Sequence, residues 1–198
     1  MSLLPWLSAA LEARDPYLSG HSTRVTDFAE GLARVLGWRD RDLETLRVGG
    51  SLHDVGKIAV DPRVLRKPGP LTVAECAQIR RHPVTGARLM DIVDDLSRAL
   101  PYVLHHHERW DGCGYPYGIG GSGIPLEGRL LAVADAFDAM TTARSYRPAL
   151  AVDAALGELE RCAGSQFDPQ LARTFVRGWE CGEIGAGVPA AVVAVAPS

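Results

Sequence analysis

Two short strings carry the residues best suited to chemistry: LHDVGK at residues 52–57 and HHERWDGCGYP at residues 106–116. The first places Asp54 directly after His53, and the second begins with the adjacent pair His106 and His107. Imidazole nitrogens and carboxylate oxygens at this density are typical ligands of transition-metal ions. The two strings therefore predict a metal centre of the kind that metal-dependent hydrolases use.

The histidines of the chain fall at positions where helices are expected to begin, end or point inward. A lone inward histidine is more often a core residue with satisfied hydrogen bonds, but several histidines beside acidic residues favour metal ligation. The set comprises His21, His53, His82, His105, His106 and His107.

Asp135 lies in the apolar run LLAVADAF at residues 130–137. An unpaired carboxylate in such a run costs several kcal/mol, and a metal ion would remove that cost. A capped or ion-paired buried aspartate is the alternative interpretation. Asp138, three residues further on, is the other acid that could serve as a ligand.

Helical periodicity dominates the chain and positions these residues. His21 shares a helix face with the apolar residues that follow it, so we expect it to point inward. The next helix starts near Asp40 or Asp42, carries Leu43, Leu46, Gly50 and His53 on one stripe, and breaks at Gly56. The apolar face of the first helix comprises Val25, Phe28, Ala29, Leu32, Val35 and Leu36.

Further helices are expected along the rest of the chain. Prolines mark a loop before residue 72, and the pattern TVAE at residues 72–75 predicts a capping box. A helix from about His82 should bury Gly86, Leu89 and Val93, and the next should run from about Leu96 to the histidine triplet. Later helices are predicted at residues 126–139, 152–162 and 169–179.

The stretch of residues 111–128 is too rich in glycine and proline for regular structure, with seven Gly and two Pro. We expect an ordered or gating loop with room for a short hairpin. No other segment alternates like a strand, so the predicted fold class is all-α. At 198 residues, the chain suits a single domain over residues 1–198, with a core of about 14–178 and an apolar tail of about 183–198.

Charge and composition limit the class of ligand and the compartment. The net charge of −3 and the pI near 6.1 offer no polybasic surface for a nucleic-acid polymer. The four cysteines form no CxxC pair, which suits a reducing cytoplasm. The first residues show no basic region followed by a long apolar core, so we expect no secretory signal. The apolar residues 188–196 fall short of the roughly 20 that span a bilayer.

The two strings, together with KPGPLT at residues 67–72, IPLEGRLLAVADAFDAMT at residues 124–141 and SYRPA at residues 145–149, resemble the HD-GYP family of cyclic di-GMP phosphodiesterases. The match runs in register from about Arg14 to about Phe175. The resemblance implies an HD-domain helical bundle with a glycine-rich GYP loop. It also implies a bacterial signalling hydrolase that cleaves cyclic di-GMP to linear pGpG, with a further step to GMP left open.

The resemblance further implies a ligand set for two divalent ions, Fe or Mn with Zn possible on ligand type. Asp54 would bridge the ions, and a hydroxide between them would attack phosphorus. Family members with a third ion carry a glutamate where this chain has Tyr17, so we expect a binuclear site. One ion would use His21, His53, Asp54 and Asp135, and the other His82, His106 and His107.

By the same resemblance, Lys57 would neutralise charge on the phosphoryl oxygens, and Arg144 and Arg147 would bind substrate phosphate. Tyr115 or Trp110 could stack on a base, although a rigid loop that only supports the ligands is an equal alternative. The loop could also dock diguanylate cyclase domains. The family's GYP loop corresponds to Gly112, Gly114, Tyr115 and Pro116.

Two rival functions remain at this point. A different HD-superfamily phosphohydrolase would act on another cyclic dinucleotide or on a nucleotide. A docking module would bind cyclic di-GMP without turning it over. A chain that begins close to the catalytic motifs also fits a segment of a longer protein with an upstream sensory or receiver domain.

Overall fold

The structure is a computed structural model that describes residues 20–143 and 148–185, apart from the side chains at positions 94 and 95. Within these ranges the regular elements are helical, and the one recorded bridge joins Ala163 to Phe167. The predicted all-α fold class is therefore confirmed. Because both ends of the chain lie outside these ranges, the single-domain boundaries and the apolar tail stay predictions.

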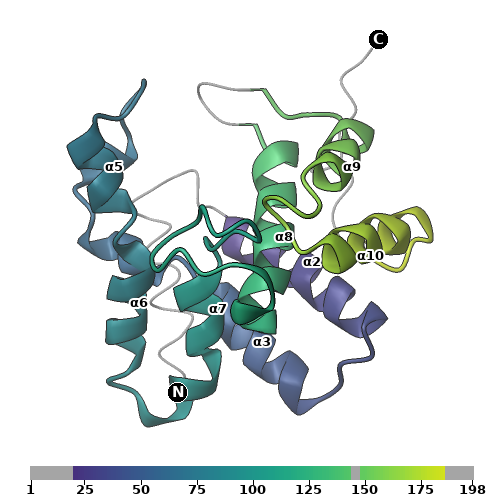
Figure 1. The fold of residues 1–198 in the computed structure, drawn as a ribbon. Coiled ribbons are helices and arrows are strands. Elements are labelled where there is room, and N and C mark those ends of the chain that lie inside the picture. The colour runs from purple at the N-terminus through teal and green to yellow at the C-terminus, as the bar shows by residue number, and fades with distance from the viewer. Residues whose placement is uncertain (1–19, 144–147, 186–198) are drawn as a thin grey trace.

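The elements up to α7 follow one another with short connections, whereas the longer glycine-rich loop separates α7 from α8. Helices α2, α3 and α8 lie between the α5–α6 side and the α9–α10 side of the molecule (Figure 1). None of the described helices combines the length and the low charge that a bilayer span requires. The elements are α2 (His21–Val35), α3 (Arg41–Leu52), η2 (Val55–Ala59), α4 (Pro62–Leu65), α5 (Val73–Ile79), α6 (His82–Met90), η3 (Asp94–Ala99), α7 (Leu100–His105), η4 (Gly121–Gly123), α8 (Leu126–Thr141), α9 (Val152–Arg161) and α10 (Pro169–Glu180).

Two apolar clusters hold these helices together. The larger one joins α2, α3, α7, α8, α9 and α10, and within it the Phe28 and Phe137 rings pack edge to face with centroids 5.1 Å apart. The smaller cluster includes Leu52, Met90 and Val103 from α3, α6 and α7. The clusters fix the ends of α3, α6 and α7 against α2 and α8, which is where the histidines lie.

Several predictions about helices are confirmed. Thr72 and Glu75 form the expected capping box, in which the Thr72 hydroxyl accepts from Glu75 N and the Glu75 carboxylate accepts from Thr72 N. Helices α8, α9 and α10 lie within two residues of their predicted limits. Asp40 occupies the N-cap position of α3, but its backbone has φ of 40° and its side chain makes no capping bond.

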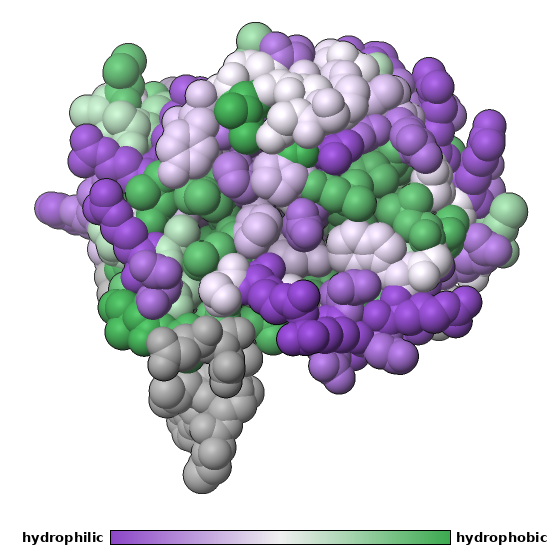
Figure 2. Space-filling model, turned by 60° about the horizontal axis from the view of Figure 1, so that its bottom comes forward, coloured by the Kyte–Doolittle hydropathy of each residue, from purple (hydrophilic) through white to green (hydrophobic). Residues whose placement is uncertain are grey.

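Other predictions about burial and local structure were wrong. Leu89 and Val93 are 41% and 44% exposed, and Met90 fills the core instead. The buried face of α6 runs through Gly86 and Met90, so Leu89 lies off that face, and Val93 lies beyond the end of the helix. Val35 is also exposed, at the end of α2. Figure 2 shows apolar side chains reaching the surface among hydrophilic ones on the face it presents.

Two local segments also differ from the predictions. The segment before α7 forms the 3-10 element η3, so α7 starts at Leu100 rather than at about Leu96. The described glycine-rich loop holds no hairpin and forms only the short 3-10 turn η4.

A close contact between main chains joins η2 to α6. A Cβ atom on Gly56 would lie 2.0 Å from the carbonyl oxygen of His82 and 2.5 Å from the amide nitrogen of Gly86. Backbone atoms cannot move aside as a side chain can, so only glycine fits here. This contact sets the segment of His53 and Asp54 against that of His82.

Gly56→Ala should therefore lower the free energy of unfolding by at least about 1–3 kcal/mol, the usual cost of overpacking. Gly157 is the matched control, because it lies in the exposed interior of α9 and a Cβ there meets nothing within 4 Å. Gly157→Ala should raise the stability by about 0.5–1 kcal/mol. Urea unfolding measures both changes, and equal stability of Gly56→Ala and wild type would contradict the role of the contact.

Candidate metal centre

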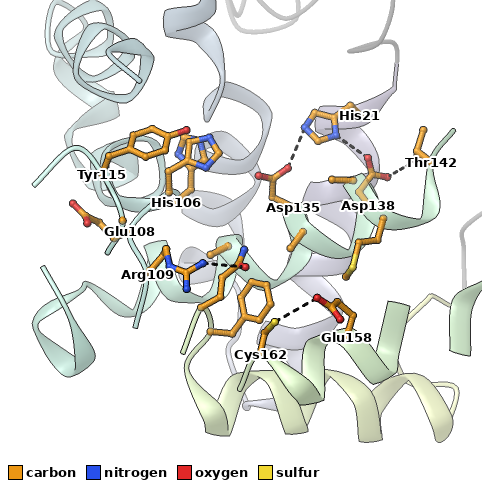
Figure 3. A pocket seen from close by; sticks show the side chains of 18 of the residues that line it. His21, His106, Glu108, Arg109, Tyr115, Asp135, Asp138, Thr142, Glu158 and Cys162 are labelled. Atoms are coloured by element: carbon orange, nitrogen blue, oxygen red, sulfur yellow. Dashed lines mark hydrogen bonds and ion pairs between the residues drawn. The ribbon is translucent and has the colours of Figure 1, made fainter. Parts of the chain in front are cut away.

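The predicted ligands come from the ends of separate helices and meet at one place. His21 begins α2, His53 follows α3, His82 begins α6 and His106 follows α7. His21, His53, Asp54, His82 and His106 are all buried, at 5% exposure or less. Asp135 projects from the middle of α8, and Figure 3 shows it facing His21 across from His106.

Asp54 lies at the centre of this cluster. Its Oδ1 is 3.2 Å from His82 Nε2 and 3.8 Å from His106 Nε2. Its Oδ2 is 3.5 Å from His53 Nε2 and 3.8 Å from His21 Nε2, and it accepts a hydrogen bond of 2.6 Å from Lys57 Nζ. One carboxylate therefore reaches two sets of histidines.

Two groups of potential ligand atoms, each within 4.8 Å of one another, share Asp54. Asp135 belongs to neither group, although its Oδ1 is 3.4 Å from His21 Nε2 and so borders the group of His21. The groups are Asp54, His82, His106 and His107, and His21, His53 and Asp54.

Three of the histidines are oriented in the same way. Nδ1 of His53 lies 2.7 Å from Gly50 O, Nδ1 of His82 lies 2.8 Å from Ile79 O, and Nδ1 of His106 lies 2.8 Å from Val103 O. A carbonyl oxygen only accepts, so each Nδ1 must carry the proton and each Nε2 keeps a lone pair.

The lone pairs then face one another without a proton between them. His82 Nε2 is 3.2 Å from His106 Nε2, and Asp54 Oδ1 is buried without a hydrogen-bond partner among the described residues. Electron pairs this close repel unless a cation lies among them. The donor set thus fits divalent metal ions.

His21 is oriented by a carboxylate instead of a carbonyl. Its Nδ1 donates to Asp138 Oδ2 at 2.7 Å, and Arg24 Nε donates to Asp138 Oδ1 at 2.6 Å. The Asp138 side chain is 2% exposed, whereas that of Asp135 is 18% exposed. The burial argument made from sequence for Asp135 therefore describes Asp138, while Asp135 faces the cavity.

Burial sets the charge of the candidate ligands. It lowers the pKa of His53, lowers that of His106 well below its usual value, and lowers that of His107 to about 3. These three imidazoles are neutral near pH 7, as ligands must be. Burial would raise the pKa of Asp54, but Lys57, His53 and His82 together outweigh burial and hold that pKa well below the usual range.

His21 differs from the other candidate ligands. Burial lowers its pKa, but the hydrogen bond to Asp138 and the charges of Asp135, Asp54 and Asp138 together outweigh burial and raise the pKa.

A cavity of about 660 Å³ opens beside the cluster. It extends along α8 to Gln166, where Arg109 Nη1 donates to Gln166 Oε1 at 3.3 Å (Figure 3). His21, Lys57, His107 and Asp135 line it together with Gly114 and Tyr115 of the GYP loop, and Pro116 does not. The cavity is large enough for a small phosphate ester with its organic groups.

The GYP loop packs tightly against the metal cluster. The Tyr115 ring stacks on His107 with centroids 4.7 Å apart, and the Tyr115–Pro116 peptide is cis. A Cβ on Gly114 would lie 2.4 Å from Arg109 N, and the buried Glu108 carboxylate accepts from Tyr117 N at 2.7 Å. These contacts favour a loop that supports the ligands, and Glu108 is a residue that the sequence reasoning missed.

The structure does not place every residue predicted for the site in the cluster of ligands. Arg144, Arg147 and Tyr17 lie outside the described residues. His105 is described, but it belongs to neither group of potential ligands and packs on Tyr117 with centroids 5.9 Å apart.

Comparison with known proteins gives consistent matches. The family model described as HD domain matches residues 5–171. The chain is 40% identical over 174 residues to the cyclic di-GMP phosphodiesterase response regulator RpfG of Xanthomonas campestris, which covers 87% of this chain and 46% of that protein. It is 34% identical over 182 residues to the 3'3'-cGAMP-specific phosphodiesterase 2 of Vibrio cholerae, which covers 88% of this chain and 34% of that protein.

The fold also matches solved structures. A crystal structure of a cyclic GMP-AMP specific phosphodiesterase of V. cholerae aligns with 98% of this chain and 53% of its own, with a TM-score of 0.67 and 19% identity. At this identity the match concerns the fold alone. The chain spans less than half the length of the curated relatives reported above.

Removal of the Asp138 carboxylate should weaken metal binding, because the His21 ring would lose the partner that holds its Nε2 toward Asp54. Asp138→Ala should reduce Mn²⁺ affinity about 10- to 100-fold, as other losses of ligand-orienting groups do. Asp138→Asn keeps an acceptor for the His21 Nδ1–H group and should therefore lose less Mn²⁺ affinity than Asp138→Ala. Glu158→Ala, which removes a carboxylate from the same cavity wall, is the control. Calorimetric titration measures the Mn²⁺ affinity of each variant. Equal affinities of Asp138→Ala and Glu158→Ala would refute the orienting role of Asp138.

Proposed function

The chain belongs to the HD domain family, in its HD-GYP group, and we propose that it is a metal-dependent phosphodiesterase that hydrolyses cyclic di-GMP to linear pGpG. The single observation that carries the proposal is the convergence of histidine lone pairs on Asp54 at the wall of the cavity. A further cleavage to GMP stays open.

We assign the metal ligands as the seven residues predicted from sequence. Asp54 would serve both ions because it belongs to both groups of potential ligand atoms. Such ions, when bound, supply Lewis acidity and lower the pKa of water. Mixed nitrogen and oxygen donors suit Fe or Mn, and Zn is compatible with the same ligand types. The ligands are His21, His53, Asp54, His82, His106, His107 and Asp135.

Side chains of the protein keep Asp54 ionised and three of the histidines neutral, which are the forms that bind metal ions. The charge of Lys57, whose Nζ donates to Asp54 at 2.6 Å, helps to keep Asp54 ionised, and Lys57 also lines the cavity. There its positive charge can stabilise negative charge that develops on the phosphoryl oxygens. Burial keeps His53, His106 and His107 neutral, so they bind metal rather than protons near pH 7.

The substrate class rests on the relatives. The names of the matched proteins specify cyclic di-GMP in one case and 3'3'-cGAMP in another, so a cyclic dinucleotide is common to both. We assign cyclic di-GMP from the higher identity of the first relative. Arg144 and Arg147 remain proposed phosphate contacts, and the GYP loop remains the proposed docking site for diguanylate cyclase domains. The name response regulator in one relative supports the proposal of an upstream receiver domain, in a longer protein that would contain this chain.

Turnover tests the proposal directly. Protein loaded anaerobically with Fe(II) or Mn(II) should release pGpG from cyclic di-GMP and should hold two ions per chain by elemental analysis. Asp54→Ala should lose both ions and the activity, since two cations share this carboxylate. If the protein cleaves 3'3'-cGAMP faster than cyclic di-GMP, 3'3'-cGAMP would replace cyclic di-GMP as the assigned substrate. Binding of cyclic di-GMP without cleavage by the loaded protein would favour the docking module instead.

Lys57→Ala should slow turnover while retaining metal, because the lysine stabilises charge and is not a ligand. Loss of a comparable donor costs about 10² in kcat. Lys67→Ala is the matched control, since Lys67 forms an ion pair of 2.7 Å with Glu75 on the α5 side. A kcat of Lys57→Ala equal to that of the control would remove Lys57 from the reaction.

A further inference from the structure

Four arginine and lysine side chains line the cavity: Arg24, Lys57, Arg80 and Arg109. Arg24 is paired with Asp138 at 2.6 Å, and Lys57 is paired with Asp54 at 2.6 Å. Arg109 is paired with Asp111 through Nε and Nη2. Their charges are largely neutralised by the protein itself.

Arg80 is different from these three residues. Within the described part of the chain, no carboxylate lies within ion-pair distance of it, and no hydrogen bond occupies its guanidinium. It follows α5 as the C-cap residue and is exposed at the rim of the cavity. Its N–H donors are therefore available to an anion.

The Tyr115 ring holds this guanidinium at the cavity. Arg80 Cζ lies over the ring at 5.3 Å from its centroid, and the same ring stacks on His107. A cation over an aromatic face is stabilised while its N–H groups stay free at the edge of the plane. Arg80 is thus fixed one ring away from a candidate metal ligand.

We propose that Arg80 binds the phosphate of the cyclic dinucleotide that is not being cleaved, an inference that rests on the proposed function. A cyclic dinucleotide carries two phosphates, and the cleaved one would lie at Asp54 and Lys57. The second phosphate carries its own negative charge, and a free guanidinium binds phosphate through paired hydrogen bonds. Arg80 would act in addition to the proposed phosphate contacts Arg144 and Arg147. In this arrangement Tyr115 positions Arg80 and does not stack on a base.

The test compares Arg80→Ala with Arg81→Ala. Arg81 is the adjacent arginine, so both variants lose one positive charge. Arg81 is exposed but does not line the cavity, so only Arg80→Ala removes a charge from the cavity. Two substrates are used with metal-loaded protein: cyclic di-GMP and bis(p-nitrophenyl) phosphate, which has one phosphate. Calorimetry measures the affinity for cyclic di-GMP independently of turnover.

Arg80→Ala should weaken cyclic di-GMP binding and raise its KM about 10- to 100-fold, the range for a lost charged hydrogen bond. The loss of kcat/KM should be at least about tenfold larger for cyclic di-GMP than for bis(p-nitrophenyl) phosphate. Arg81→Ala should match wild type in both assays. Arg80→Lys should restore part of the affinity, because it keeps the charge but not the paired geometry.

Three results would overturn the inference: equal affinities of Arg80→Ala and Arg81→Ala, equal losses on the two substrates, or no binding of cyclic di-GMP by the wild type. Binding without turnover would refute only the proposed function, because the affinities of the variants would still decide the role of Arg80.

Discussion

The hydrogen bond from a histidine Nδ1 to the carbonyl three residues earlier is the interaction on which the site depends. It occurs at His53, His82 and His106, and the carbonyls belong to the last turns of α3, α5 and α7. Carbonyls in a last turn have no partner within their own helix. The same bond therefore satisfies a helix end and aims a lone pair at Asp54, so that folding of the helices also builds the donor set.

The sequence predicted which residues form the site better than it predicted the residues that orient them. Histidines beside acids, spaced at the ends of apolar helices, were enough to expect that His21, His53, Asp54, His82 and His106 would meet, and the structure brings them together. The helical periodicity also predicted the all-α fold. These features are local or repeat with a helical period, which a single sequence displays directly.

The supporting groups depend on contacts between distant segments, which the sequence does not display. Asp138 is 117 residues from His21 along the chain, and only the packing of α8 against α2 shows that it orients that ring. The apolar run around Asp135 predicted burial, but the helix turns this residue to the cavity and buries Asp138. Leu89 shows the same limitation, because the exposed end of α6 is decided by its neighbours.

The main-chain contact of Gly56 with His82 has a consequence for the two groups of donors. His53 and Asp54 lie three and two residues before Gly56, and the His82 carbonyl is too close to Gly56 to leave room for a Cβ atom. The separation between these segments is therefore set by the radii of backbone atoms, which have no rotamers to adjust. Exchange of one ligand side chain for another can change which ion is preferred. The distance between the His53–Asp54 segment and the His82 segment, however, is determined by the backbone.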